Sequence, residues 1–163
     1  MRKIKLIGEV NEVMYEHFST ELDELLAKSS KPIEVELNSE GGLSIDALAI
    51  VGRMKTAPCP FYVTVYGRAM SAAVLILAAG NRRRMSNIAW LMYHEDCGKV
   101  KGNTSDMKFA ALRFEQEEQQ WAELLQKYTG RAASQWRAFA KQTTYFSAEE
   151  ALKVGLIDEI VGR

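Results

Sequence analysis

The chain has 163 residues, 47% of them hydrophobic and 26% charged, a balance typical of one soluble globular domain with a sizeable core. Its 21 basic and 21 acidic residues cancel, so no basic field indicates nucleic acid or a membrane surface as a partner. Two cysteines without CxxC or Cys/His spacing predict neither a disulfide framework nor a metal site, and they favour a reducing, cytoplasmic setting. No motif indicates a cofactor.

The first ten residues begin with basic side chains, but Lys5 and Glu9 interrupt their apolar run. This pattern favours a first strand near residues 3–8 over a signal peptide or a membrane span. Strand-like and helix-like segments then alternate. Strands are expected within 32–42, 57–67 and 87–98, and helices within 11–30, 43–57 and 71–80. The alternation predicts an α/β fold with a parallel, right-handed core.

One long helix is expected over about residues 103–130, ending at a glycine. It is too long for an ordinary packing helix, so one half is expected to pack on its own domain while the other half projects. Projection would leave Phe109, Phe114 or Trp121 in water, which predicts self-assembly through this helix. The stretch GNRRRM at 80–85 is expected to be a solvated loop. The whole chain, 1–163, is expected to form a single domain.

The stretch VYGRAMSAAVLILAAG at 65–80 places one serine, Ser71, before eight apolar residues. One interpretation is a small residue that caps a helix or eases its packing. The other is a nucleophile at a strand-to-helix turn, where the backbone lifts the hydroxyl out and aims the first N–H groups of the helix at a forming anion. The rest of the chain has to decide between them.

Five segments in the order and spacing seen here resemble the signature of the caseinolytic protease proteolytic subunit family, ClpP. They are NSEGGLSIDALAI, GRAMSAA, LMYHEDCG, the long helix ending in KYTG, and YFSAEEALKVGLIDEIV. The resemblance covers almost the whole chain. It implies the ClpP/crotonase-type spiral of ββα units, with the long helix as the projecting handle between rings of subunits.

By this resemblance Ser71 is the nucleophile and His94 is the general base that takes its proton and passes it to the leaving amine. The backbone N–H groups of Gly42 and Ala72 would form the oxyanion hole. Taken alone, His94 would be interpreted as a histidine at a strand end, and the glycine pair as a plain turn. Their collinear order with Ser71 favours the catalytic interpretation.

The resemblance also implies residues that bind an extended peptide substrate by β-pairing. These are Gly41 and Leu43 beside the glycine turn, and Cys97, Gly98 and Lys99 after His94.

Three departures from the family pattern change what is expected. The family's third catalytic residue, an aspartate four residues before the serine of the YFSA segment, corresponds to Thr143, so Thr143 or, less directly, Asp96 or Glu95 would orient His94. The acid–arginine pair that helps to couple rings in the family is Lys141-Gln142 here, which predicts weak ring–ring contact. The chain begins at the family's opening strand, so we expect no N-terminal axial loop and no gated entrance.

The sequence therefore predicts a cytoplasmic serine endopeptidase subunit that cleaves unfolded peptides inside a self-assembled heptameric ring or stacked double ring. Thr143 predicts low activity. Without an axial loop, stimulation by a Clp ATPase is not expected. Two alternatives stay open: a non-catalytic ring subunit, which Thr143 favours, and a crotonase-type acyl-CoA enzyme, which a nucleophile-like Ser71 and the long helix disfavour.

Overall fold

The computed structural model describes residues 2–95 and 100–162. Its strands are β1 (Lys3–Val10), β2 (Ile33–Gly42), β3 (Phe61–Met70), β4 (Arg82–Ser86), β5 (Trp90–Tyr93), β6 (Thr144–Phe146) and β7 (Glu159–Val161). Its helices are α1 (Glu12–Leu26), α2 (Ser44–Thr56), α3 (Ala72–Ala78), α4 (Thr104–Thr129), α5 (Ala133–Lys141) and α6 (Ala148–Val154). The α/β architecture expected from the alternation of segments is confirmed.

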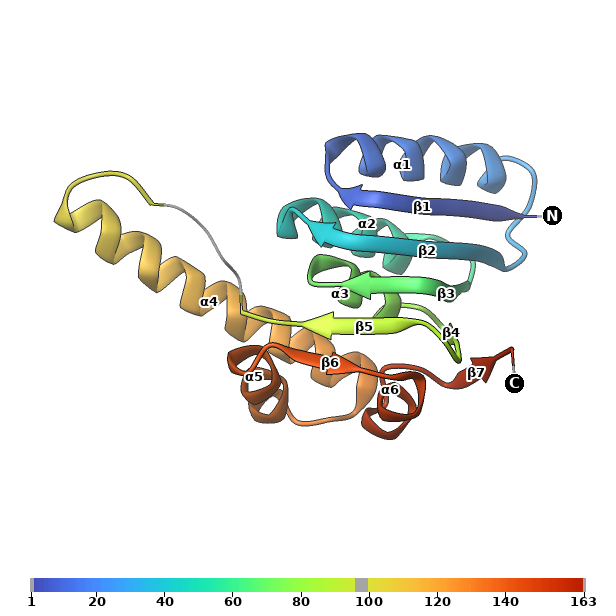
Figure 1. Cartoon of the computed structure of the whole chain (residues 1–163). Helices are drawn as coiled ribbons and strands as arrows, with labels where there is room; N and C mark the ends of the chain where they lie inside the picture. The colour runs from blue at the N-terminus through green and yellow to red at the C-terminus, as the bar shows by residue number, and fades with distance from the viewer. Residues whose placement is uncertain (1, 96–99, 163) are drawn as a thin grey trace.

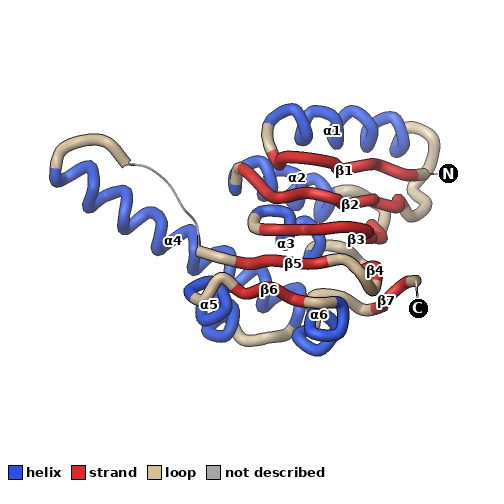
Figure 2. Tube along the Cα trace, in the orientation of Figure 1, coloured by secondary structure: helices blue, strands red, loops and turns tan. Residues whose placement is uncertain are grey.

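The described strands form one sheet in which β1, β2 and β3 are parallel neighbours (Figure 2). Strand β3 then has two partners along its length. Its first part, Tyr62–Val65, pairs with β4, and its last part, Arg68–Met70, pairs with β5. Both pairings are parallel, whereas β6 closes on β5 in the antiparallel sense. The carboxyl ends of β2, β3 and β5 therefore lie side by side at one edge of the sheet.

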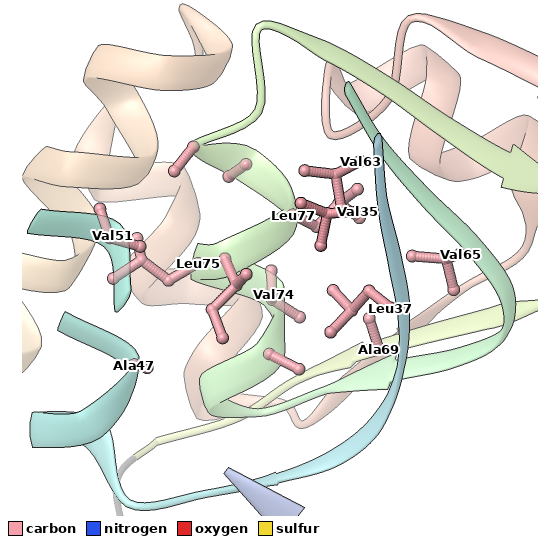
Figure 3. Packing of buried hydrophobic residues seen from close by; sticks show 14 of the residues in the cluster. Val35, Leu37, Ala47, Val51, Val63, Val65, Ala69, Val74, Leu75 and Leu77 are labelled. Carbon is pink, nitrogen blue, oxygen red and sulfur yellow. The ribbon is translucent and has the colours of Figure 1, made fainter. Parts of the chain in front are cut away.

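Helix α3 is the centre of the core. All seven of its residues are buried, so it has no solvent-facing side, as its unbroken apolar sequence requires. Figure 3 shows Val74, Leu75 and Leu77 of this helix between strands β2 and β3 on one side and helix α2 on the other. Because interiors of this kind are close-packed, the first residue of α3 is held rigidly against the end of β3.

The arginine-rich stretch at 82–86 is a strand, and the expectation of a solvated loop was wrong. Its arginine side chains form ion pairs with acidic residues from distant parts of the chain. Arg82 binds Glu159 at 2.5 Å, Arg83 binds Asp158, and Arg84 binds Glu34. Burial alone would raise the pKa of Asp158, but hydrogen bonds from Arg83 and the charges of Arg83 and Arg82 outweigh it and lower that pKa.

Helix α4 projects from the sheet at its N-terminal half and packs on the domain at its C-terminal half (Figure 1). Asn103 caps it, and the Asp106 carboxylate accepts a hydrogen bond from the Asn103 N–H at 3.0 Å, completing a capping box. Phe109 is 72% exposed. Trp121 is only 8% exposed, so the expectation that a projecting helix would leave it in water was wrong.

Candidate active site

Ser71 lies between the last residue of β3 and the first residue of α3. Its φ of 52° and ψ of −123° are unusual for a residue with a side chain, and its N–H donates to the Met92 carbonyl of β5 at 2.8 Å. Its side chain makes no capping hydrogen bond to α3. The hydroxyl is therefore not explained by helix capping, and the sharp turn directs it away from the helix.

His94 follows directly after β5. Because Met92 of that strand pairs in register with Met70, the residue two places later arrives beside Ser71. The His94 Nε2 lies 2.9 Å from Ser71 Oγ. This is hydrogen-bonding distance, and it is the geometry that a base needs to remove the hydroxyl proton.

The glycine turn after β2 is pressed against this pair. The Gly41 N–H donates to the buried Ser39 hydroxyl at 3.0 Å, and its φ is 92°. A Cβ at Gly41 would lie 2.7 Å from the Ser71 Cβ and 2.5 Å from the Met70 carbonyl oxygen. A Cβ at Gly42 would lie 2.2 Å from the Val10 carbonyl oxygen. Only glycine fits at either place, so the turn and the serine are built as one unit.

The two N–H groups predicted to form the oxyanion hole belong to segments in direct contact, since the Cβ position of Gly41 lies 3.1 Å from the Ala72 nitrogen. The glycine turn therefore lies against the backbone of Ser71 and Ala72 at the position of Gly41. The neighbouring Leu43 places its side chain in solvent, but its N–H donates to the Val10 carbonyl at 2.7 Å. An extended substrate would meet the Leu43 side chain and not its N–H.

Thr143 directly precedes β6, the strand that pairs with β5 just before His94. Strand β6 pairs Thr144 with Tyr93, and the N–H groups of both Thr143 and Glu95 donate to the Ala140 carbonyl, at 3.0 Å and 3.2 Å. Thr143 has a φ of 49°; within residues 2–95 and 100–162 it shares a positive φ with one other non-glycine residue, Ser71. No hydrogen bond joins the Thr143 hydroxyl to the His94 ring, both of which belong to the part of the chain that the structure describes.

A pocket of about 460 Å³, which includes space open to solvent, adjoins the Ser71–His94 pair. Ser71, Ala72 and His94 line it, together with eight further residues, of which the sequence had indicated only Glu95 as a possible part of the site. Two of these residues, Glu117 and Glu118, belong to the polar EQEEQQ block, whose only sequence signal was its charge. All eight come from α2, α4, α5 and the end of β5: Ser44, Tyr93, Glu95, Glu117, Glu118, Trp121, Arg137 and Ala140.

Asp96 and the predicted substrate-binding residues Cys97, Gly98 and Lys99 lie outside the described residues. In the part of the chain that is described, no cluster of three or more His, Cys, Asp and Glu side chains is arranged to hold a metal ion. None of the helices of residues 2–95 and 100–162 combines the length and apolar content that a bilayer crossing needs.

Comparison with known proteins places this geometry in a family. The sequence profile of the Clp protease family matches residues 1–163. An ATP-dependent Clp protease proteolytic subunit 2 from Mycolicibacterium paratuberculosis is 29% identical over 165 residues, covering 99% of this chain and 83% of the relative. An ATP-dependent Clp protease proteolytic subunit 1 from Mycobacterium tuberculosis is 30% identical, covering 99% of this chain and 82% of the relative. With a match along its full length, the chain belongs to the Clp protease family.

Proposed function

We propose that the chain is a serine endopeptidase subunit that cleaves unfolded peptides inside a self-assembled ring chamber in the cytoplasm. The observation that carries this proposal is the 2.9 Å separation of Ser71 Oγ and His94 Nε2 at a strained strand-to-helix turn. The family supports peptide hydrolysis as the reaction.

In the proposed reaction Ser71 Oγ attacks the scissile carbonyl carbon while His94 Nε2 takes the hydroxyl proton. The negative charge that forms on the carbonyl oxygen is stabilised by hydrogen bonds from the N–H groups of Gly42 and Ala72. When the C–N bond breaks, His94 gives its proton to the departing amine and an acyl-serine ester remains. His94 then takes a proton from water, which attacks the ester carbon. The bond between that carbon and Ser71 Oγ breaks, His94 returns the proton to Oγ, and the peptide leaves with a new carboxyl terminus. No nucleotide takes part in these steps.

Thr143 is the residue that we propose to orient the His94 ring. Its hydroxyl can accept one hydrogen bond, but it carries no charge to stabilise the imidazolium that forms during the reaction. We therefore propose slow turnover. The same observation favours a second candidate function, a ring subunit without catalytic activity, and the following experiment separates the two.

A fluorophosphonate probe is expected to label Ser71 and no other described serine. Its hydroxyl alone is paired with an imidazole, whereas the exposed Ser105 lies on helix α4. Mass spectrometry of the digested protein would locate the adduct. Ser71→Ala should remove the label and the control Ser105→Ala should retain it. An assembled, folded protein that takes up no label at Ser71 would support the non-catalytic subunit instead.

Assembly is proposed to depend on the projecting half of α4. Met107, Phe109 and Leu112 are more than half exposed there, and the family relatives are named as subunits. The purified protein should form large oligomers by light scattering, and Phe109→Ser should lower their mass while Lys108→Ser, at the exposed neighbouring position, should not. With Lys141-Gln142 at the ring-coupling position, contact between rings should be lost first on dilution. A monomer at high micromolar concentration would contradict this proposal.

A further inference from the structure

The glycine turn after β2 is held by one buried side chain that the proposed reaction does not use. Ser39 is fully buried, and its hydroxyl accepts a hydrogen bond from the Gly41 N–H at 3.0 Å. We infer that Ser39 is a positioning residue for the oxyanion hole, because its hydroxyl fixes the turn from which the Gly42 N–H donates. The inference rests on the proposed function, which makes the Gly42 N–H an oxyanion donor.

Strand β2 leaves its regular pairing with β1 directly before the turn. Ile7 pairs with Asn38. The next pair is Glu9 with Gly41, so β2 carries one residue more than β1 between the two pairs. Such a bulge interrupts the ladder of hydrogen bonds and leaves backbone groups to find other partners. At Gly41 the N–H group finds the Ser39 hydroxyl, two residues back along the chain.

The peptide group that carries the Gly42 N–H lies between two anchored N–H groups. On its far side the Leu43 N–H donates to the Val10 carbonyl at 2.7 Å, a main-chain bond to β1. On its near side the Gly41 N–H is held by the Ser39 hydroxyl. A side-chain substitution at Ser39 therefore removes the near anchor and leaves the far one in place.

The near anchor matters because two glycines stand in succession. Gly41 has a φ of 92° and Gly42 a φ of 149°. Without a Cβ, each can take either sign of φ, so the peptide plane between them rotates easily unless its neighbours are held. An oxyanion donor acts only while it is aimed at the place where the negative charge forms. Ser39 thus supplies a restraint that the glycine pair lacks.

The strand that carries Ser39 also borders the nucleophile. Ser39 pairs in register with Ala69 of β3, two residues before Ser71. At the other end of the turn, the Cβ position of Gly41 lies 2.7 Å from Ser71 Cβ. The turn and the nucleophile are therefore set by the same pair of strands, and a change in the turn alters the donor relative to the Ser71 hydroxyl.

The alternative is that the Ser39 hydroxyl does no more than satisfy a buried N–H group. In that case Ser39→Ala would lower the melting temperature and slow all acyl substrates alike. A positioning role affects the reactions in which negative charge forms on an oxygen atom. Substrates that differ in this one atom therefore separate the two roles.

A 4-nitrophenyl ester and its thionoester, in which sulfur replaces the carbonyl oxygen, make this comparison. Ser71 Oγ attacks either carbon and expels 4-nitrophenolate, whose absorbance gives the acylation rate. Sulfur accepts hydrogen bonds weakly, so the thionoester gains little from the donors. Ser39→Ala should lower the ester rate at least about tenfold, part of the 10²–10³ that loss of a whole donor costs, and the thionoester rate less than about threefold. A smaller folded fraction lowers both rates equally and cancels in their ratio.

Two further variants keep the shape of the side chain constant. Ser39→Thr retains the hydroxyl, and Ser39→Val has nearly the same shape without it, so any strain from the added methyl group is common to both. Ser39→Thr should keep a higher ester-to-thionoester ratio than Ser39→Val. Ser19→Ala is the control, because it removes a shielded hydroxyl of α1 that has no hydrogen-bond partner among residues 2–95 and 100–162. The control should keep the wild-type ratio.

Each other outcome has a distinct meaning. Equal losses of the ester and thionoester rates in Ser39→Ala, or equal ratios in Ser39→Thr and Ser39→Val, would overturn the positioning role while the serine chemistry stands. Wild-type rates in Ser39→Ala would overturn it as well. If the wild-type protein reacts with neither ester and takes up no fluorophosphonate at Ser71, the proposed function itself fails.

Discussion

His94→Ala is expected to lower the rate of Ser71 acylation at least about a thousandfold, since general-base catalysis commonly contributes 10²–10⁴ and removal of a triad histidine can cost more. The His94 Nε2 lies 2.9 Å from Ser71 Oγ, and the described structure brings no other imidazole to that hydroxyl. Without it, a serine hydroxyl at neutral pH keeps its proton and is a weak nucleophile. Progress curves with an activated ester and with a fluorophosphonate would measure the loss.

The chain offers a matched control in its second histidine. His17 is exposed on helix α1, so His17→Ala removes the same side chain without touching the site. This variant should retain the wild-type rate, and both variants should show wild-type oligomer mass and far-ultraviolet circular dichroism. A His94→Ala protein that acylates at a rate close to wild type would mean that another group activates Ser71.

Local sequence patterns were enough to predict the parts of the fold in which consecutive segments bury their own apolar residues. The alternating segments gave the parallel α/β core, and the unbroken apolar run after Ser71 indicated a fully buried helix, which α3 is. Strand β4 could not be recognised in the same way. Its three arginines look solvated in sequence, and they are accommodated because Glu159, Asp158 and Glu34 arrive from elsewhere in the chain.

The candidate site, like the fold, could be predicted only in part from the sequence. Ser71 was a candidate from its place at a strand-to-helix turn, whereas His94 and the glycine pair became candidates through the resemblance to the family's segments. All of them follow parallel strands, which end at one edge of the sheet. The pocket was not identifiable. Glu117, Trp121 and Arg137 lie on helices whose packing on the domain depends on long-range contacts, and periodicity alone gave Trp121 the wrong environment.

Two strained residues flank His94, and their strain has different explanations. At Ser71 the positive φ turns the chain from β3 into α3, where the hydroxyl lies 2.9 Å from His94 Nε2. At Thr143 a φ of 49° costs about 1–2 kcal/mol for a residue with a Cβ, and a β-branched side chain is a poor choice there. Asparagine and aspartate tolerate this backbone conformation better than threonine does. The backbone conformation at position 143 would therefore suit an aspartate better than the threonine that is present.

Thr143→Asp is accordingly expected to raise peptide turnover at least about tenfold, the rate change for some 1.4 kcal/mol of added transition-state stabilisation. A carboxylate beside His94 would hold the ring by a charge-assisted hydrogen bond and stabilise the imidazolium, and loss of that charge costs roughly 10⁴ in turnover in the best-studied serine protease. Initial rates on a short fluorogenic peptide, at matched oligomer concentration, would measure the gain.

Thr143→Asn separates charge from backbone strain, because asparagine matches aspartate in shape and in its tolerance of a positive φ but carries no charge. Both variants should raise the melting temperature by similar amounts, and only Thr143→Asp should raise turnover by the full factor. Equal gains in turnover would mean that relief of strain, and not charge, had limited the reaction. If Thr143→Asp leaves turnover unchanged while Asp96→Asn abolishes it, the third catalytic position belongs to Asp96 and Thr143 has no part in orienting His94.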